Sequence, residues 1–361
     1  MVDSLPDQPR KGRGAMGNAA GRFDARDRVR IDDGWWQEKE LAEQWVTDLK
    51  PDASRTILTR NTSPDIPFDR SINPYKGCEH GCIYCFARPT HSYWGLSPGL
   101  DFETKIFFKS GGAALLEKEL RKPGYQCAPI ALGVNTDAYQ PAEKELGVTR
   151  DILHVLHAYQ HPVSIITKSA RILRDLDLLA PLAAKNLVHV MISITTLDPA
   201  LARVMEPRAS APANRLKAME ALNKAGVPTG LLASPMIPAL NDMELEAILA
   251  AAADRGAVQA GYIFLRLPNE LTELFEDWLR THFPDRADRV LSLIRQSRAG
   301  ALNSTRFGER MRGTGPYADT LNKRFKVACK KLGISRRNET WAFDTSLFQP
   351  PPQAGDQMRL L

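Results

Sequence analysis

The sequence contains no long run of apolar residues. Nowhere in its 361 residues is there an apolar stretch of about 18, the length that a membrane-spanning helix needs. The first thirty residues have no apolar core of the kind found in secretion signals, and they mix Asp with Arg, which is atypical of organelle transit peptides. We therefore expect a cytoplasmic protein that does not span a membrane.

Cysteine is scarce, with five residues in the chain. So few cysteines in a long chain without an export signal do not suggest a disulfide framework. Three of them fall within eight residues, a spacing typical of metal ligands, whereas Cys127 and Cys329 stand alone. We interpret these two as small buried hydrophobic residues.

Neither sign of charge dominates the chain. Its net charge is +6 and its pI about 9.0, a mild basic excess that is compatible with polyanionic partners without being evidence for them. With 43% hydrophobic and 25% charged residues, the composition is that of a globular protein that buries a sizeable core.

The chain divides into three regions. Residues 1–60 are polar and form an N-terminal arm whose first thirty residues we expect to be largely disordered. Within the arm, Asp33–Leu49 carries Trp and Leu at helical spacing and predicts one amphipathic helix that docks on the body. Residues 61–298 form the core, and residues 299–361 form a basic, mostly helical C-terminal extension.

From Ser71 onward, short apolar runs alternate with helical patterns. This alternation is typical of β-then-α units around a parallel sheet, and nearly continuous hydrophobicity fits strands covered on both faces. The predicted strands are Ser71–Tyr75, Ile130–Val134, Val163–Thr167, Val188–Ile194, Thr229–Ser234 and Gly261–Leu265. Six units are too few for a closed eight-stranded barrel. The fold class is therefore α/β, a partial (β/α)6 barrel with catalytic groups at the C-terminal ends of its strands.

Helical patterns separate the predicted strands. We expect Ser169 to cap a helix over Arg171–Lys185, and Asn241 with Glu244 to form a capping box ahead of Leu245–Arg255. The other predicted helices are Gly112–Arg121, Thr149–Gln160, Ala211–Ala225 and Asn269–Phe283. The C-terminal extension predicts one more helix, with a basic face.

Three histidines, His154, His157 and His161, fall on one helical stripe. A stripe of this kind either binds a metal or faces solvent. Because the helix lies outside the barrel, we interpret it as a solvated stripe.

The three clustered cysteines occupy the loop after the first predicted strand. Cys78, Cys82 and Cys85 have the spacing C-x3-C-x2-C, and Gly77 and Gly81 allow the backbone to turn tightly enough to direct three sulfurs at one point. A cubane cluster has four irons and normally takes four thiolates. Three local thiolates therefore leave one iron open to an external ligand.

A structural zinc site is the competing interpretation. It needs four ligands of the Cys and His type, and His80, His91 or Cys127 is available as the fourth. Zinc ligands usually come as two separated pairs, however, and the sequence has no second pair. We therefore favour a 4Fe-4S cluster.

The cysteine motif resembles that of the radical SAM superfamily, which uses S-adenosylmethionine (SAM). Further segments resemble the branch related to spore photoproduct lyase, which is described as DNA repair photolyase-like. Residues 60–120 resemble an uncharacterised bacterial subgroup of that branch. The segments are 135–143, 167–169, 174–177, 193–198, 206–207, 215–216 and 235–242. The resemblance covers about residues 55–345.

The resemblance implies a radical SAM enzyme with lyase-like or modification chemistry. In such enzymes a 4Fe-4S cluster reductively cleaves S-adenosylmethionine, and the resulting 5′-deoxyadenosyl radical abstracts hydrogen from a substrate. The resemblance also implies an electron donor of the flavodoxin or ferredoxin type.

The same resemblance assigns cofactor contacts at the strand ends. Thr136 and Asp137 lie where the family contacts the SAM amino group, although roles as caps or turn formers are equally open. Lys168 and Ser193 lie where related enzymes hold the SAM carboxylate and ribose.

Four more residues complete the expected cofactor site. Arg215 pairs either with the SAM carboxylate or with Glu206. Tyr84 packs near the adenine, and Ile237 belongs to its apolar wall. Asn241 is either a cofactor contact or a helix cap.

The hydrogen donor of the related lyase is not matched here. That enzyme uses a cysteine near the end of its second strand, where this chain has Asn135. Cys127 precedes the strand and Cys329 lies in the extension, so both are weak candidates for a catalytic role and no catalytic residue is assigned.

Three functions stay open. The first is an enzyme that repairs or modifies nucleic acid, with phosphates contacted by basic residues of the extension, for which a solvated helix face is an equal alternative. These residues are Arg306, Arg310, Arg312, Lys323, Arg324, Lys326, Lys330 and Lys331. The second is a radical SAM enzyme acting on a protein or small molecule. The third is a non-catalytic zinc- or iron-binding module.

Overall fold

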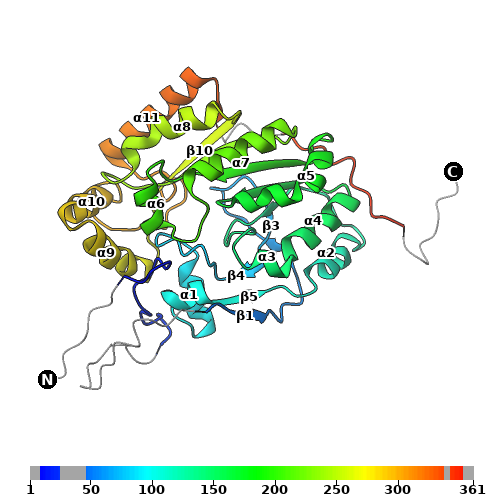
Figure 1. Ribbon diagram of the computed structural model, residues 1–361, viewed down its shortest axis with the longest axis horizontal. Coiled ribbons are helices and arrows are strands. Elements are labelled where there is room, and N and C mark those ends of the chain that lie inside the picture. The colour runs from blue at the N-terminus through cyan, green and yellow to red at the C-terminus, as the bar shows by residue number, and fades with distance from the viewer. Residues whose placement is uncertain (1–8, 25–45, 337–341, 353–361) are drawn as a thin grey trace.

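An eight-stranded sheet forms the centre of the molecule. The computed structural model describes residues 9–24, 46–336 and 342–352. Among these residues, the strand order of the sheet is β11-β10-β9-β8-β7-β6-β3-β2. Only β2 runs antiparallel to its neighbour, and the other strand pairs of this sheet are parallel. Helices cover the outside of the sheet (Figure 1).

The strands of this sheet are short, and β7 to β10 are its longest. Their bounds are β2 (Thr59–Arg60), β3 (Arg70–Ile72), β6 (Ile130–Leu132), β7 (Val163–Thr167), β8 (Val188–Ser193), β9 (Thr229–Met236), β10 (Gln259–Phe264) and β11 (Ser335–Arg336). A second sheet has the order β1-β5-β4 and consists of β1 (Asp48–Pro51), β4 (Tyr75–Lys76) and β5 (Lys105–Phe108).

The helices follow the strands in chain order. Their bounds are α1 (Leu100–Thr104), α2 (Gly112–Leu120), α3 (Glu143–Leu146), α4 (Val148–Ala158), α5 (Leu176–Ala183), α6 (Pro199–Met205), α7 (Pro212–Lys224), α8 (Leu245–Ala253), α9 (Leu271–His282), α10 (Pro284–Gln296) and α11 (Gly315–Leu332). The described residues also form the 3-10 helices η2 (Arg88–Trp94), ahead of α1, and η3 (Ala170–Asp175) and η4 (Asp242–Glu244), which lie between α-helices. None of the described helices is both long and apolar enough to cross a membrane.

The six predicted strands are present as β3, β6, β7, β8, β9 and β10, and their sequential parallel order confirms the open partial barrel. The largest difference is at the first strand, which was predicted to continue to Tyr75 but ends at Ile72. Tyr75 and Lys76 instead pair with β5 in the second sheet. The apolar pattern could not reveal this change of partner, because both stretches are buried.

Most predicted helices are confirmed, and three details differ. Ser169 caps its helix by accepting a hydrogen bond from the Arg171 N–H, but the first turns form the 3-10 helix η3 before α5 begins. Asn241 makes no capping hydrogen bond, so the predicted capping box is wrong. Helix α10 was not predicted, although Pro284 stands in the first turn, where its missing N–H is harmless.

The histidine stripe is only partly solvated. Helix α4 ends at Ala158, so His161 lies beyond it and is fully buried. Its Nε2 lies 2.8 Å from the Tyr125 hydroxyl and its Nδ1 lies 3.0 Å from the Pro162 carbonyl oxygen. The prediction of a solvated position is therefore wrong for His161, whereas His154 is exposed as expected.

The N-terminal arm departs most from its prediction. Residues 9–24 pack on the body, with Ala15 and Met16 buried, so this part of the arm is ordered, contrary to the expectation. Most of the predicted helix Asp33–Leu49 lies outside the described residues. Its last positions, Asp48 and Leu49, belong to strand β1, which pairs with β5.

The C-terminal extension is joined to the core. Helix α11 forms as predicted and packs beside α8 (Figure 1), with Leu321 and Phe325 buried in the main hydrophobic cluster. A second cluster lies at α6, α9 and α10 and includes Ile83 and Tyr84 from the cysteine loop. The division at residues 60 and 298 stays a prediction.

Candidate active site

A cavity of about 700 Å³ opens at the C-terminal ends of the parallel strands. This edge is where catalytic groups of βα barrels gather, and the volume is in the range of ligand pockets. Lining residues that follow or end a strand are Asn73, Thr136, Asp137, Lys168, Ser193, Pro235 and Arg266. The cavity therefore brings together residues that are far apart in the chain.

The cysteine loop forms one wall of this cavity. Cys78, Cys82 and Cys85 all line it, together with Tyr84. Gly77 and Gly81 adopt left-handed conformations, with φ of 80° and 66°. A Cβ on Gly81 would come within 2.7 Å of a Glu103 carboxylate oxygen. The tight turns that the sequence predicts are therefore present, and packing as well as conformation requires glycine at Gly81.

The three thiols have raised pKa values. Burial raises the pKa of Cys78 and Cys85, and it raises the pKa of Cys82 to about 12, against the opposing effect of Lys168 and Arg215. Without a metal the thiols therefore stay protonated at neutral pH, whereas coordination deprotonates a thiol. Three thiols on one loop, open to a cavity with cations beside them, fit a cluster that carries sulfide and one open iron.

Of the three residues that could complete a zinc site, His80 lines the cavity with the cysteines, whereas His91 does not. Within the described residues, no group of three or more His, Cys, Asp and Glu side chains is arranged to hold a single metal ion. Nδ1 of His80 lies 3.4 Å from Asp137, and Nε2 of His91 lies 3.0 Å from the Lys105 carbonyl oxygen. The Cys127 side chain is not part of the cavity wall.

Arg88 fixes the cysteine loop from behind. The side chain is fully buried, and it donates to the carbonyl oxygens of Cys82 at 2.8 Å and Gly81 at 3.0 Å. It also forms an ion pair with Glu103 at 2.5 Å. Neither residue of the pair was singled out from the sequence, although Arg88 closely follows the cysteine motif and Glu103 lies within residues 60–120.

The N-terminal segment 9–24 packs against the same buried pair. The Gly14 and Ala15 N–H groups donate to the two carboxylate oxygens of Glu103, at 3.1 and 2.8 Å. A Cβ on Gly14 would lie 1.8 Å from the Gly81 carbonyl oxygen, so the segment lies directly on the cysteine loop. We call residues 9–24 the N-terminal strap.

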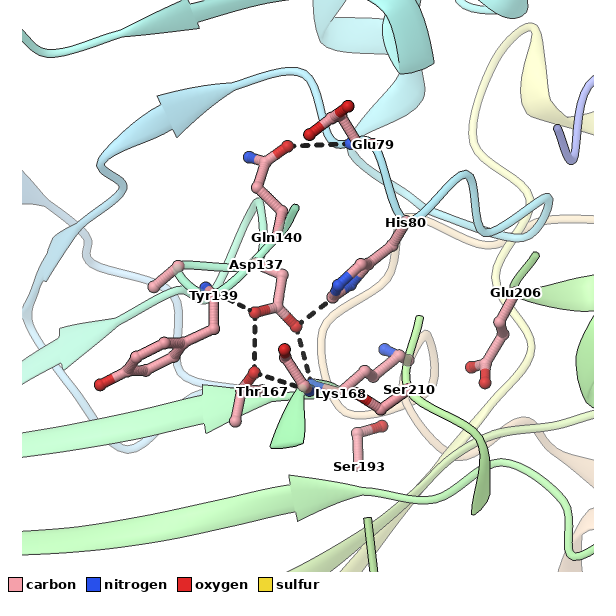
Figure 2. A network of polar contacts seen from close by, with 12 residues as sticks. Glu79, His80, Asp137, Tyr139, Gln140, Thr167, Lys168, Ser193, Glu206 and Ser210 are labelled. Carbon is pink, nitrogen blue, oxygen red and sulfur yellow. Dashed lines mark hydrogen bonds and ion pairs between the residues drawn. The ribbon is translucent and has the colours of Figure 1, made fainter. Parts of the chain in front are cut away.

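Asp137 connects the cysteine loop with strand β7 (Figure 2). One carboxylate oxygen accepts from the Thr167 hydroxyl at 2.7 Å and the Tyr139 N–H at 2.9 Å. The other accepts from the Lys168 N–H at 2.7 Å and faces His80. Burial raises the pKa of Asp137, but His80 and these hydrogen bonds outweigh it and lower the pKa well below its usual value. The carboxylate is thus charged and already fully bonded.

Thr136 and Gln140 also support the loop. The Thr136 hydroxyl donates to the Tyr75 carbonyl oxygen at 2.6 Å. The buried Gln140 amide accepts from the Glu79 N–H at 2.9 Å and donates to the Gly77 carbonyl oxygen at 3.2 Å. Thr136 lines the cavity, but its hydroxyl is used within the protein. Gln140 stands in the motif 135–143, yet sequence reasoning did not single it out.

Lys168 differs from these residues, since its ammonium is free. The side chain lines the cavity, and its Nζ lies 5.7 Å from the centre of the Tyr84 ring. Within the described chain it has no hydrogen-bond or ion-pair partner. Burial lowers the pKa of Lys168, but Cys82 and Glu206 outweigh this and raise it. The cavity therefore presents a permanent positive charge beside the cysteines.

A buried pair lies behind Lys168. Arg215 binds the Glu206 carboxylate and donates to the Ser193 carbonyl oxygen at 3.0 Å. The Tyr84 hydroxyl also donates to Glu206, and the Thr195 hydroxyl donates to it at 2.7 Å. Of the two partners left open for Arg215, the structure selects Glu206. Arg215 is not among the residues that line the cavity.

Of the other expected site residues, one lines the cavity and two are buried outside its wall. Ser193 lines the cavity, whereas Ile237 and Asn241 are fully buried outside its wall. The Asn241 amide accepts from the Ile237 N–H at 2.6 Å and donates to the carbonyl oxygens of Thr195 and Pro235. Asn241 therefore holds two strand-end loops together.

Neither isolated cysteine reaches the cavity. Cys127 lies ahead of β6, at the opposite edge of the sheet, and burial raises its pKa to about 11. Cys329 is buried on α11 in the main hydrophobic cluster. Neither residue is therefore placed to act as a donor in this cavity.

Two of the basic residues of the extension are paired with other side chains, and the others are exposed. Arg310 lines the cavity and is bound by Asp65 and Ser63. On α11, Arg324 pairs with Glu246 at 2.6 Å. The remaining basic side chains are exposed and do not line the cavity, namely Arg306, Arg312, Lys323, Lys326, Lys330 and Lys331.

Comparison with known sequences gives a consistent result. The family model of the radical SAM superfamily matches residues 72–252. An uncharacterised protein of Mycobacterium tuberculosis is 37% identical over 233 residues, which cover 64% of this chain and 68% of that protein. An uncharacterised protein of Methanocaldococcus jannaschii is 29% identical over 177 residues, covering 48% of this chain and 62% of that protein.

Solved structures of spore photoproduct lyase have a similar fold. The lyase complexed with dinucleoside spore photoproduct superposes with a TM-score of 0.57 at 15% identity, covering 80% of this chain and 81% of that chain. A mutant lyase with bound AdoMet and dinucleoside spore photoproduct gives 0.56 at 13% identity, covering 80% of both chains. At these identities the likeness concerns the fold alone.

Proposed function

The chain belongs to the radical SAM superfamily, and from this premise we propose that it is an enzyme whose Cys78, Cys82 and Cys85 hold a 4Fe-4S cluster. When bound, a cluster of this type supplies an electron that cleaves S-adenosylmethionine, and the 5′-deoxyadenosyl radical abstracts hydrogen from a substrate. The observation that carries the proposal is the position of three thiols and the free Lys168 ammonium on one cavity wall.

The protein's own residues orient the cofactor. Lys168 is the best candidate to hold the SAM carboxylate, because it is a cation without a protein partner. Ser193 and Tyr84 line the cavity beside it. The other predicted contact residues act on the cofactor indirectly, through the loops that they hold in place. They are Asp137, Thr136, Arg215, Ile237 and Asn241.

The loop itself is held from behind. Arg88 and Gln140 each bind its backbone, which keeps the three sulfurs at fixed positions as a preorganised metal site requires. Cys78 and Cys82 are each 7% exposed, which limits the access of water to these two thiols.

Anaerobic reconstitution tests the proposal. Wild-type protein supplied with iron and sulfide should develop broad visible absorption, and dithionite with SAM should then yield 5′-deoxyadenosine. A Cys82→Ser variant should do neither, whereas Cys127→Ser, which changes a thiol outside the cavity, should behave as wild type. About one zinc per chain, no visible absorption and no SAM cleavage would instead establish a non-catalytic metal-binding module.

The substrate class is a separate part of the proposal. We favour nucleic acid over a protein or small molecule, because exposed Lys and Arg side chains of the extension accompany a cavity rich in cations. Binding of DNA or RNA that weakens steeply with salt supports this choice. Absent or salt-insensitive binding rules out nucleic acid and favours a protein or small-molecule substrate. Metabolite comparison of a deletion strain is then the next test.

A further inference from the structure

Arg266 is a second cation of the cavity wall without an anionic partner. It stands two residues after the end of β10 and lines the cavity. Its Nε is buried and has no hydrogen-bond partner among the described residues. One guanidinium nitrogen lies 3.7 Å from the Met311 sulfur, which is a weak acceptor. A buried donor without an acceptor is unfavourable unless a ligand supplies one.

The charges around Arg266 are mainly positive. Burial and the neighbouring Arg310 lower the pKa of Arg266. Burial and Arg266 in turn lower the pKa of Arg298 to about 10. The nearby carboxylate, Asp65, is bound by Arg310 and by the Gly308 N–H at 2.7 Å. This part of the wall therefore attracts an anion.

Two aromatic residues on either side of Cys85 separate the two free cations. Lys168 lies 5.7 Å from the Tyr84 ring, and Arg266 lies 5.8 Å from the Phe86 ring. Tyr84 is buried, whereas Phe86 is 46% exposed. The strands that precede the cations, β7 and β10, are three places apart in the sheet, or about 14 Å at roughly 4.8 Å per strand. The cavity thus has an inner cation position at Lys168 and an outer one at Arg266.

We propose that Arg266 binds a negatively charged group of the substrate, a phosphate or a carboxylate, while a flat part of the substrate lies on the Phe86 ring. This inference rests on the proposed function, in which the single carboxylate of SAM is held by Lys168. A guanidinium recognises either anion through paired N–H donors. An exposed aromatic ring beside the anion site favours a planar group attached to it.

Small probes test the anion site directly. The cluster-loaded protein, with and without SAM, is titrated with phenyl phosphate, benzoate and the neutral benzamide, and binding is followed by ligand-observed NMR. At least one anion should bind wild type about tenfold more tightly than Arg266→Gln, the size expected for a lost charged hydrogen bond. Benzamide should bind both proteins equally weakly. The tighter anion identifies the class of group.

Two further variants keep the result interpretable. Arg266→Lys retains the charge and should recover most of the affinity. Arg289→Gln removes an exposed charge from α10 and should bind the anions as wild type does. Wild-type binding that does not distinguish the anions from benzamide, or unchanged anion affinity in Arg266→Gln, overturns the inference.

Affinity for SAM separates this inference from the proposed function. Arg266→Gln should bind SAM as tightly as wild type does, and a loss of SAM affinity would place Arg266 on the cofactor and overturn the inference. If anion binding depends on Arg266 but wild type forms no 5′-deoxyadenosine, the anion site stands and the proposed function fails.

Discussion

Asp137 and Lys168 follow the neighbouring strands β6 and β7, yet their side chains are used differently. Asp137 has protein partners at both oxygens, so a ligand gains little from it. Lys168 has no such partner in the described chain. The difference lies in the surroundings and not in the residue type, because a bonded carboxylate is part of the scaffold and a free ammonium is part of the binding surface.

Replacement of Lys168 by Gln should weaken SAM binding at least about tenfold, because a carboxylate would lose its charged partner. The affinity is measured by equilibrium dialysis of the cluster-loaded protein. Lys217→Gln, at an exposed position on α7, serves as the control and should leave the affinity unchanged. An unaltered affinity in Lys168→Gln would show that the SAM carboxylate lies elsewhere.

His161 should make stability depend on pH. Burial lowers the pKa of His161 to about 4, below the value of about 6.5 in an unfolded chain. Below pH 6.5 the unfolded state therefore binds a proton that the folded state does not, and stability falls until about pH 4. The loss attributable to His161 is about 3 kcal/mol at most.

The measurement compares wild type with His161→Gln by denaturant unfolding between pH 4 and pH 8. The variant loses the hydrogen bond to Tyr125, so it is less stable at neutral pH, but the difference between the two proteins should shrink as the pH falls. The residues that face His161 include Tyr125 and Arg70, which do not titrate in this range. A difference that is constant with pH would rule out His161 as the cause.

At the scale of elements, the N-terminal strap and the cysteine loop form one structural unit. The strap donates to Glu103, Glu103 pairs with Arg88, and Arg88 holds the backbone of the loop. Asn18 and Asp101 add two reciprocal hydrogen bonds, at 3.1 and 2.9 Å. The strap therefore stabilises the position of the three sulfurs without contributing a ligand.

Gly14→Val should loosen this unit. Its Cβ would meet the Gly81 carbonyl oxygen at 1.8 Å, so the strap must move away from the loop. We expect a reconstituted cluster to be lost to a chelator about tenfold faster, an effect typical of residues that support metal ligands. The decay of visible absorption gives the rate. Lys11→Val, at an exposed position of the strap, should decay like wild type, and equal rates for Gly14→Val would exclude the supporting role.

At the scale of the whole molecule, the cavity lies where several parts of the chain converge. Its wall combines the ends of the parallel strands with the cysteine loop and residues 310–311 ahead of α11. A cluster bound there should stabilise the folded state as a whole, since its ligands are not preformed in the unfolded chain.

Removal of the cluster should therefore lower the midpoint of thermal unfolding by about 5 °C or more. Anaerobic calorimetry of loaded and chelator-treated wild type measures the shift. The Cys82→Ser variant should melt at the same temperature with and without chelator. Equal melting temperatures of the two wild-type samples would mean that the cluster makes no net contribution to stability.

The sequence by itself determined the six strands of the partial barrel and the grouping of three cysteines in one loop. Apolar runs such as Val163–Thr167 and Val188–Ser193 are signals within a few residues, and the three cysteines lie within one loop. Local patterns of this kind reflect backbone geometry and burial, so they need no knowledge of distant partners.

Tertiary structure alone decided which polar groups are free. Gly14 and Glu103 are 89 residues apart, and no spacing rule connects them. Arg215 had two possible partners, and its charge was satisfied by Glu206. Arg266 and Lys168 are left without anions because no described carboxylate is placed to bind them. Whether a charge is paired depends on distance in space, and that distance is set only when the chain has folded.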